Sequence, residues 1–392
     1  MVMQLFFSCA YLYTLLQCRL FTIIRQFSYG FMTNKIKSIQ ALRGIACVAV
    51  VAFHNRAELT GQFPSLNKIL SSGVVGVDLF FILSGFVITL SVARTCTGIA
   101  AAGDFLKRRA LRLLPAYFIL LLVNFLLGGA MATFHYPDKV QSLIAALTLS
   151  VYMPHHAPFY MDDEGFLNVR WTLNYEFLFY LIMAVCLLVR ARWAALTVAL
   201  GGVLVALPMA AGHQPTLSTD GYDMGYSYIN LMTNPIIWQF AAGVLIGLVY
   251  PYMVRLPVAA RVPFLVVAVA LAAQHFSANQ YVGHGLMASG TVLALLLAAV
   301  AFNDSWLARI TPRWLVFVGD ISFSVYLIHI VTMRQMYKVF PAGGPLLFAA
   351  SMAAALFLGW LSYRYIEPIG QKIADRRKAA AAQNKQTAIS KI

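Results

Sequence analysis

The stretch Ser38-Ile-Gln-Ala-Leu-Arg-Gly-Ile-Ala-Cys-Val-Ala-Val-Val-Ala-Phe-His54 is the part of the sequence that decides the fold. It is apolar and close to the length of a membrane-spanning helix, yet it carries Arg43 and His54. Their separation of eleven residues corresponds to about 16 Å along a helix and brings both side chains to within about 20° of one face. Ionisable groups inside a membrane span are costly and usually face an internal cavity. The segment is therefore predicted to line an internal path.

The composition of the whole chain indicates a membrane protein. Its mean hydropathy is +0.74 and only 11% of its residues are charged, against about 25% in soluble domains. The net charge of +15 comes from basic residues spread between apolar runs, which argues against a nucleic-acid-binding patch. The five cysteines are odd in number and lack metal-ligand spacing, so neither a disulfide framework nor a metal site is predicted.

Apolar runs of about 18–22 residues predict an all-α, polytopic membrane bundle. Most of the 29 Lys and Arg residues fall in alternate connections, which predicts those connections and both termini on the cytoplasmic side. The run 140–153 is short and Pro154 follows it, so a re-entrant or interfacial helix is predicted there. The ten predicted spans are about 39–55, 73–92, 112–131, 171–189, 193–211, 233–250, 262–276, 285–303, 315–334 and 345–366.

Three regions follow from this pattern. Residues 1–37 are interrupted by arginines and lack a small-residue cleavage site, so they are read as an interfacial or disordered N-terminal extension. Residues 38–370 form the transmembrane domain. Residues 371–392 are polar and basic and predict a disordered cytoplasmic tail.

A cationic cluster is predicted at the inner end of the bundle. In Phe105–Pro115, helical spacing places Arg109 and Arg112 on one face, as it does Arg108 and Arg112. Arginine forks suit phosphate oxygens, although the segment alone also fits a positive-inside anchor. Together with Arg43, the cluster predicts a mouth for a cytoplasmic ligand that carries phosphate.

Three ionisable residues from three predicted spans are expected at one outer depth: His54, Asp78 and Glu176. An unpaired carboxylate at that depth is costly, so Asp78 is expected to have a partner. Either His54, which it would orient, or a purely structural partner fits. Trp171 is expected in the interfacial aromatic belt.

Tyr326 and His329 are three residues apart in the predicted span 315–334 and are expected on one helix face. A buried, hydrogen-bonded structural histidine is the favoured interpretation of His329. With Trp171 and Asn174, these two residues are further candidates for acceptor binding or for support of the site.

The ordered set of motifs resembles the acyltransferase type 3 family of integral-membrane O-acyltransferases, in its stand-alone form. The resemblance covers roughly residues 38–370, and its blocks follow one another in family order. Thr172 stands where the family often has Ser, and the first 37 residues have no counterpart. The blocks are Leu42-Arg-Gly with His54, Gly76–Phe86, Arg108–Pro115, Trp171-Thr-Leu-Asn-Tyr-Glu176, Ser324–His329 and Tyr365-Ile-Glu-Pro368.

The resemblance implies transfer of an acyl group, commonly acetyl, from cytoplasmic acyl-CoA to a hydroxyl of an extracytoplasmic glycan or lipid-linked saccharide. Acetyl-CoA would be a co-substrate and no cofactor would be bound permanently. The chain would lie in a bacterial plasma (inner) membrane, and its oligomeric state is left open.

The catalytic candidates are then His54, Glu176 and Asp78, and the acyl-CoA-binding candidates are Arg43, Arg108, Arg109 and Arg112. His54 suits a general base because its pKa is ordinarily near neutral. Two alternatives remain at this stage: a secondary transporter of an anionic solute, against which the lack of an inverted repeat argues, and a non-catalytic partner in glycan assembly.

Overall fold

The computed structural model describes residues 36–151, 157–159, 166–167, 169–278, 282–370 and 372–373. These residues form helices and connections, with no strand among them, which confirms the predicted all-α class. Eight helices of the described chain are long and apolar enough to span a membrane, and a bent helix pair, Leu286–Phe302 with Asp304–Ile310, adds a ninth. Most of the predicted N-terminal extension and tail lie outside the described residues.

Every predicted span coincides with a helix. The segment 171–189 corresponds to α7 (Arg170–Cys186), whose 17 residues make it shorter than the eight long helices. The predicted non-spanning segment is α6 (Pro137–Thr148), whose 12 residues rise only about 18 Å, too little for a core of about 30 Å. The other main helices are α2 (Lys37–Asn55), α3 (Pro64–Ser71), α4 (Gly76–Val92), α5 (Ile99–Leu127), α8 (Arg192–Gly201), α9 (Leu207–Ala210), α10 (Ser227–Thr233), α11 (Trp238–Met253), α12 (Val258–Ala278), α13 (Thr291–Phe302), α14 (Asp304–Ile310), α15 (Arg313–Val339) and α16 (Gly344–Tyr365).

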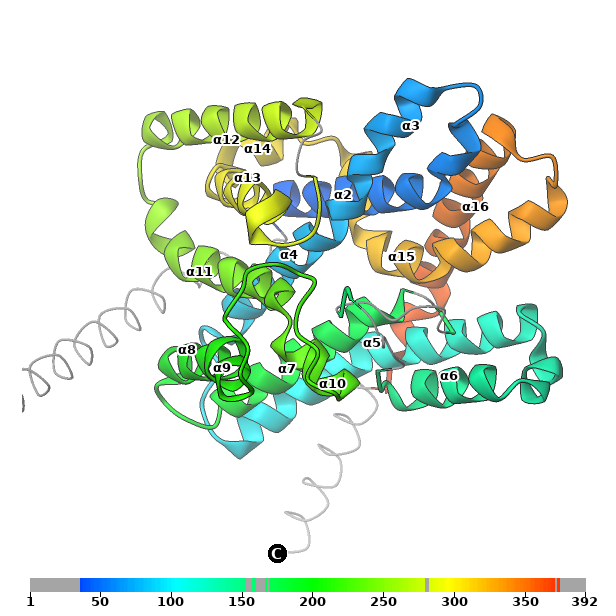
Figure 1. The fold of residues 1–392 in the computed structure, drawn as a ribbon. Helices are drawn as coiled ribbons and strands as arrows, with labels where there is room; N and C mark the ends of the chain where they lie inside the picture. The colour runs from blue at the N-terminus through cyan, green and yellow to red at the C-terminus, as the bar shows by residue number, and fades with distance from the viewer. Residues whose placement is uncertain are drawn as a thin grey trace, which may run out of the picture.

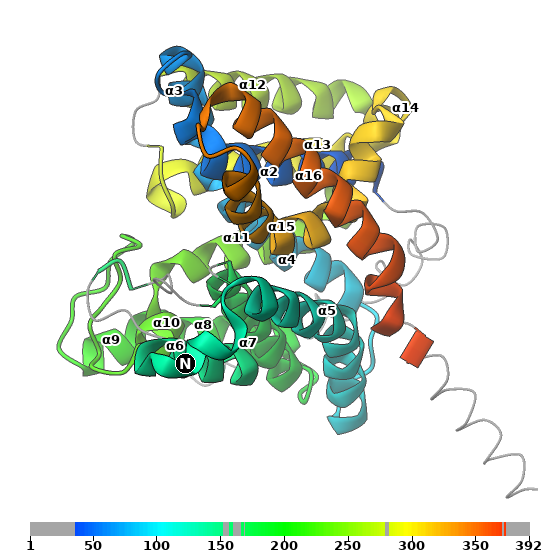
Figure 2. The ribbon, with the colours of Figure 1, turned by 90° about the vertical axis from the view of Figure 1, so that its right-hand side faces the viewer.

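The helices gather in two groups on either side of α4 and α11. One group contains α5 to α10, and the other contains α2, α3 and α12 to α16 (Figure 1). The same division is visible after a quarter turn (Figure 2). Because α15 also contacts α5, the boundary between the groups is a packed interface. The cavity described below lies at this boundary.

Glycines allow the central helices to approach backbone to backbone. A Cβ atom at Gly319 of α15 would collide with the carbonyl of Gln40 on α2. On α11, Gly243 and Gly247 lie against Ile82 and Thr89 of α4, so these two small residues form the contact face of the helix pair. The close packing fixes α2, α4, α11 and α15 as the frame that carries the site.

Two of the arginines in the predicted basic connections also cap helix ends. Arg192 is buried and donates to the carbonyls of Val92 and Thr95 at the end of α4. Arg261 donates to the carbonyl of Phe302 at the end of α13. These contacts satisfy carbonyls that a helix terminus leaves without an intrahelical donor.

Candidate active site

A cavity of about 120 Å³ lies between the two helix groups. By the same measure an engineered cavity of 150 Å³ in another protein holds benzene, so this one fits a small group of comparable size or less. Residues from five helices line it, and its polar residues are clustered. The lining residues that carry polar groups are Arg43, Ser84, Arg109, Arg112, Thr172, Glu176, Tyr180, Ser322 and Tyr326.

One end of the cavity is cationic, as the sequence predicts. Arg43, Arg109 and Arg112 all line it, although they come from α2 and α5. The Arg109 guanidinium lies 5.4 Å from the ring centre of Tyr180 and donates to Ser91 Oγ at 2.8 Å. Planar forks held in this way are preorganised to bind oxyanions.

Arg108 does not belong to this cluster. Its side chain is exposed on α5, and it does not line the cavity. Arg108 points about 100° away from Arg109 around the helix, which explains why it does not line the cavity; its predicted part in acyl-CoA binding stays a prediction. The third arginine of the cluster, Arg43, donates to Gln40 Oε1 at 3.1 Å.

Glu176 lies among the arginines and not beside His54, so the prediction that it shares an outer depth with His54 is wrong. It lines the cavity with Arg43 and accepts a hydrogen bond from Tyr180. The reason is that α7 begins inside the protein, because its first residue, Arg170, is fully buried. Six further residues carry Glu176 about 9 Å deeper.

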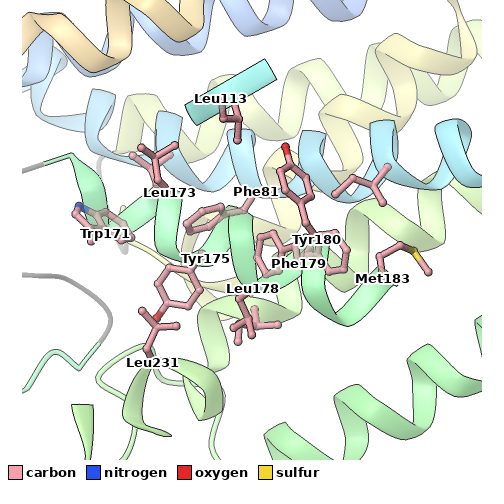
Figure 3. Close-up of a cluster of buried hydrophobic side chains, with 14 of the residues drawn as sticks. Phe81, Leu113, Trp171, Leu173, Tyr175, Leu178, Phe179, Tyr180, Met183 and Leu231 are labelled. Carbon is pink, nitrogen blue, oxygen red and sulfur yellow. The ribbon is translucent and has the colours of Figure 1, made fainter. Parts of the chain in front are cut away.

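An aromatic cluster supports this wall of the cavity. Phe81 contacts Tyr175 and Phe179 edge to face, with ring centres 5.4 and 5.7 Å apart. Figure 3 shows Tyr180 at the edge of the cluster, with its hydroxyl directed away from Phe179. The packed rings hold the Tyr180 hydroxyl where it meets Glu176.

Phe80, Thr172 and Tyr326 line the cavity on the side toward His329. The Tyr326 and Thr172 hydroxyls are 2.9 Å apart, and the ring centres of Phe80 and Tyr326 are 5.9 Å apart. Beyond Tyr326 lies His329, with ring centres 5.6 Å apart, which confirms that these two residues share a helix face.

His54 and His329 form a pair. His329 Nε2 lies 3.3 Å from His54 Nδ1, and their ring centres are 4.9 Å apart. His329 is 1% exposed, whereas His54 is only partly buried at the end of α2. The structure thus joins the two histidines that the sequence treated separately.

Asp78 does not orient His54. Its side chain is fully buried and accepts hydrogen bonds from Gln239 Nε2, from His284 Nδ1 at 2.5 Å and from the Gly285 amide at 2.9 Å. The prediction of a catalytic Asp78–His54 pair is wrong, and the alternative of a structural partner is correct. The physical reason is that α4 packs this side chain toward α11 and the loop before α13.

His284 and Gln239 are the partners that sequence reasoning missed. His284 immediately precedes residue 285, where a predicted span begins on the outer side. The sequence therefore already placed His284 at about the depth expected for Asp78, and this could have identified it as the partner. Burial disfavours the charged imidazole, but the Asp78 carboxylate more than offsets this and raises the pKa of His284.

The two remaining candidates are buried. Trp171 is 8% exposed and packs against Phe81 inside the protein, so the prediction that it belongs to the interfacial aromatic belt is wrong. Asn174 is 4% exposed, and neither of its amide atoms has a hydrogen-bonding partner among the described residues. Glu367, from the closing motif, accepts from Ser324 Oγ at 2.5 Å.

Comparison with known proteins connects this arrangement with a family. The family described as an acyltransferase domain matches residues 36–364. The chain belongs to the acyltransferase type 3 family. No solved structure matches it.

Its curated relatives include exopolysaccharide and peptidoglycan proteins. It is 29% identical to exopolysaccharide production protein ExoZ of Rhizobium meliloti (strain 1021), over 84% of this chain and 97% of that protein. It is 26% identical to peptidoglycan O-acetyltransferase OatA of Listeria monocytogenes, over 85% of this chain but only 55% of that protein. Nodulation protein 10 of Rhizobium leguminosarum bv. viciae is also 26% identical, over 76% of this chain and 82% of that protein.

Proposed function

We propose that this protein moves an acetyl group from cytoplasmic acetyl-CoA to a hydroxyl of an extracytoplasmic glycan or lipid-linked saccharide. One observation carries the proposal: a small cavity has three arginines at one end, and a histidine pair lies beyond its other end. The small volume suits an acetyl group and not a nucleotide. The nucleotide part of CoA would therefore remain outside, at the arginine end.

In this proposal the arginines bind the acyl donor and His54 activates the acceptor. Arg43, Arg109 and Arg112 bind the CoA phosphates, and the thioester reaches along the cavity toward Tyr326. His54 removes the proton of the acceptor hydroxyl, whose oxygen attacks the thioester carbonyl. A carbon–oxygen bond forms as the carbon–sulfur bond breaks, and the proton passes from His54 to the CoA thiolate.

The direction of transfer follows from the predicted topology. The arginine end lies near the basic connections, which the positive-inside bias assigns to the cytoplasm of a bacterial inner membrane, together with both termini. His54 lies about 16 Å further along α2, toward the extracytoplasmic side. This separation lets donor and acceptor reach one site from opposite faces of the membrane.

The test compares surface glycans from cells that carry the gene, lack it, or carry His54→Ala. Mass spectrometry before and after mild alkali, which removes esters, measures their acetyl content. We expect alkali-labile acetyl groups only with the wild-type gene. Identical glycans in all three strains, with the protein present in the membrane, would contradict the proposal.

A further inference from the structure

Each histidine of the pair lies within hydrogen-bonding distance of a backbone carbonyl, which fixes where its ring proton sits. His329 Nδ1 lies 2.6 Å from the carbonyl oxygen of Tyr326, and His54 Nδ1 lies 2.9 Å from the carbonyl oxygen of Val50. A carbonyl oxygen only accepts hydrogen bonds, so each Nδ1 must carry a proton. The two backbone carbonyls therefore select the same tautomer for both imidazoles.

This tautomer determines which ring nitrogen of the pair can accept a proton. A neutral imidazole with a proton on Nδ1 has a lone pair on Nε2. The Nε2 lone pair of His329 then faces the Nδ1–H of His54 at 3.3 Å, so this one N–H is shared between the Val50 carbonyl and His329 Nε2. Changing the tautomer of one ring alone would place two lone pairs or two protons against each other, and changing both would turn each Nδ1 lone pair toward a backbone carbonyl oxygen. In the neutral pair one arrangement remains, and it leaves His54 Nε2 as the nitrogen that can take a proton.

We propose that His329 is a positioning residue that holds His54 with its Nε2 lone pair directed at the acceptor hydroxyl. The inference rests on the proposed function and adds the role of a second residue to it. When His54 takes a proton on Nε2, its ring becomes cationic and the bond from Nδ1 to His329 strengthens. His329 thereby acts as the carboxylate does in a catalytic triad, but as a neutral acceptor.

Burial explains why His329 does not act as the base itself. Its side chain is 1% exposed, and both of its ring nitrogens face protein groups, Tyr326 on one side and His54 on the other. Only His54 is partly exposed. The pair is therefore asymmetric, with His54 toward the substrate and His329 behind it.

The activity test uses the full-length protein in lipid vesicles with acetyl-CoA as the probe and measures CoA release. His329→Leu removes the acceptor and is expected to lower kcat about 10- to 100-fold with KM unchanged, a loss of the size that follows removal of the residue that orients a metal-bound histidine. His329→Gln keeps an acceptor oxygen near the position of Nε2 and should remain within about 3-fold of wild type.

His275→Leu is the matched control. His275 also makes a partly buried contact, to Ser289 Oγ at 3.0 Å, but lies away from the cavity. This variant reports what the loss of a structural histidine does to yield and stability. Turnover of His329→Leu equal to wild type, or a loss in His329→Gln as large as in His329→Leu, would overturn the inference.

A second measurement locates the imidazole protons and does not depend on enzymatic activity. Nitrogen-15 NMR of histidine-labelled protein distinguishes a protonated ring nitrogen from a bare one, and the His54 and His329 variants assign the signals. We expect Nδ1 protonated and Nε2 bare on both residues. A protonated Nε2 on neutral His54 would refute the inference. Absence of CoA release in the wild type would instead count against the proposed function alone.

Discussion

Replacing Asp78 by leucine should destabilise the fold, since the structure assigns this carboxylate to a buried network. The leucine variant has a similar volume but leaves the Gln239, His284 and Gly285 donors without their acceptor. Unsatisfied buried donors cost about 1–3 kcal/mol each, and loss of one member of a buried charged pair costs about 3–5 kcal/mol. Since His284 can lose its proton in response, we expect a net loss of about 3–5 kcal/mol.

Thermal unfolding in detergent, followed by tryptophan fluorescence, measures this loss. A decrease of that size should lower the apparent Tm by on the order of 10 °C. Asp78→Asn should lose less, because its oxygen still accepts and its amide can donate to a neutral His284. Asp138→Leu, an exposed acidic residue on α6, is the control and should unfold near the wild-type temperature. An unchanged Tm for Asp78→Leu would refute the reasoning.

The same pair predicts how stability depends on pH. The pKa of His284 is raised in the folded protein above its ordinary value of 6.5, because the Asp78 carboxylate outweighs the effect of burial. The stabilisation is therefore complete below about pH 6.5 and is lost as the pH rises through the higher folded value. Wild-type Tm should fall over this window, whereas Asp78→Asn should show little change. A wild-type Tm that rises over it would contradict the pairing.

Two further predictions test the packing and the topology. Gly243→Val should sharply lower the yield of folded protein, because its side chain would collide with the α4 backbone, whereas Gly103→Val meets open space and should express normally; equal yields would contradict the packing. Cysteines introduced within 215–225 should react with an impermeant reagent in intact cells, and those within 102–106 only after permeabilisation; the reverse pattern would invert the proposed direction of transfer.

The sequence predicted the elements of this fold better than their contacts. Hydropathy located a helix at every predicted span and identified α6 as too short, because span length follows from bilayer thickness. Helical periodicity placed Arg109 and Arg112 on one face, and the structure confirms that they line one cavity with Arg43.

The rotation and depth of each helix depended on its neighbours, which sequence does not specify. Asp78 lay at a depth that fitted His54, but the packing of α4 against α11 turned it toward Gln239 and His284. Glu176 was displaced because α7 starts inside the protein. His54 and His329 are 275 residues apart in the sequence, and their contact requires α2 and α15 to lie side by side.

The central claim is that the donor binds at the arginine end of the cavity and that the proton is removed at the histidine pair beyond its other end. The most direct test measures acetyl-CoA binding and CoA release together on purified Arg109→Ala and His54→Ala proteins, with the exposed Arg108→Ala as control. Loss of the Arg109 fork should weaken binding about 10- to 100-fold, and the control should bind normally. His54→Ala should bind acetyl-CoA within about 3-fold of wild type and release CoA about 10²- to 10⁴-fold more slowly. If His54→Ala keeps more than about a tenth of wild-type turnover, or Arg109→Ala binds normally, the account is contradicted.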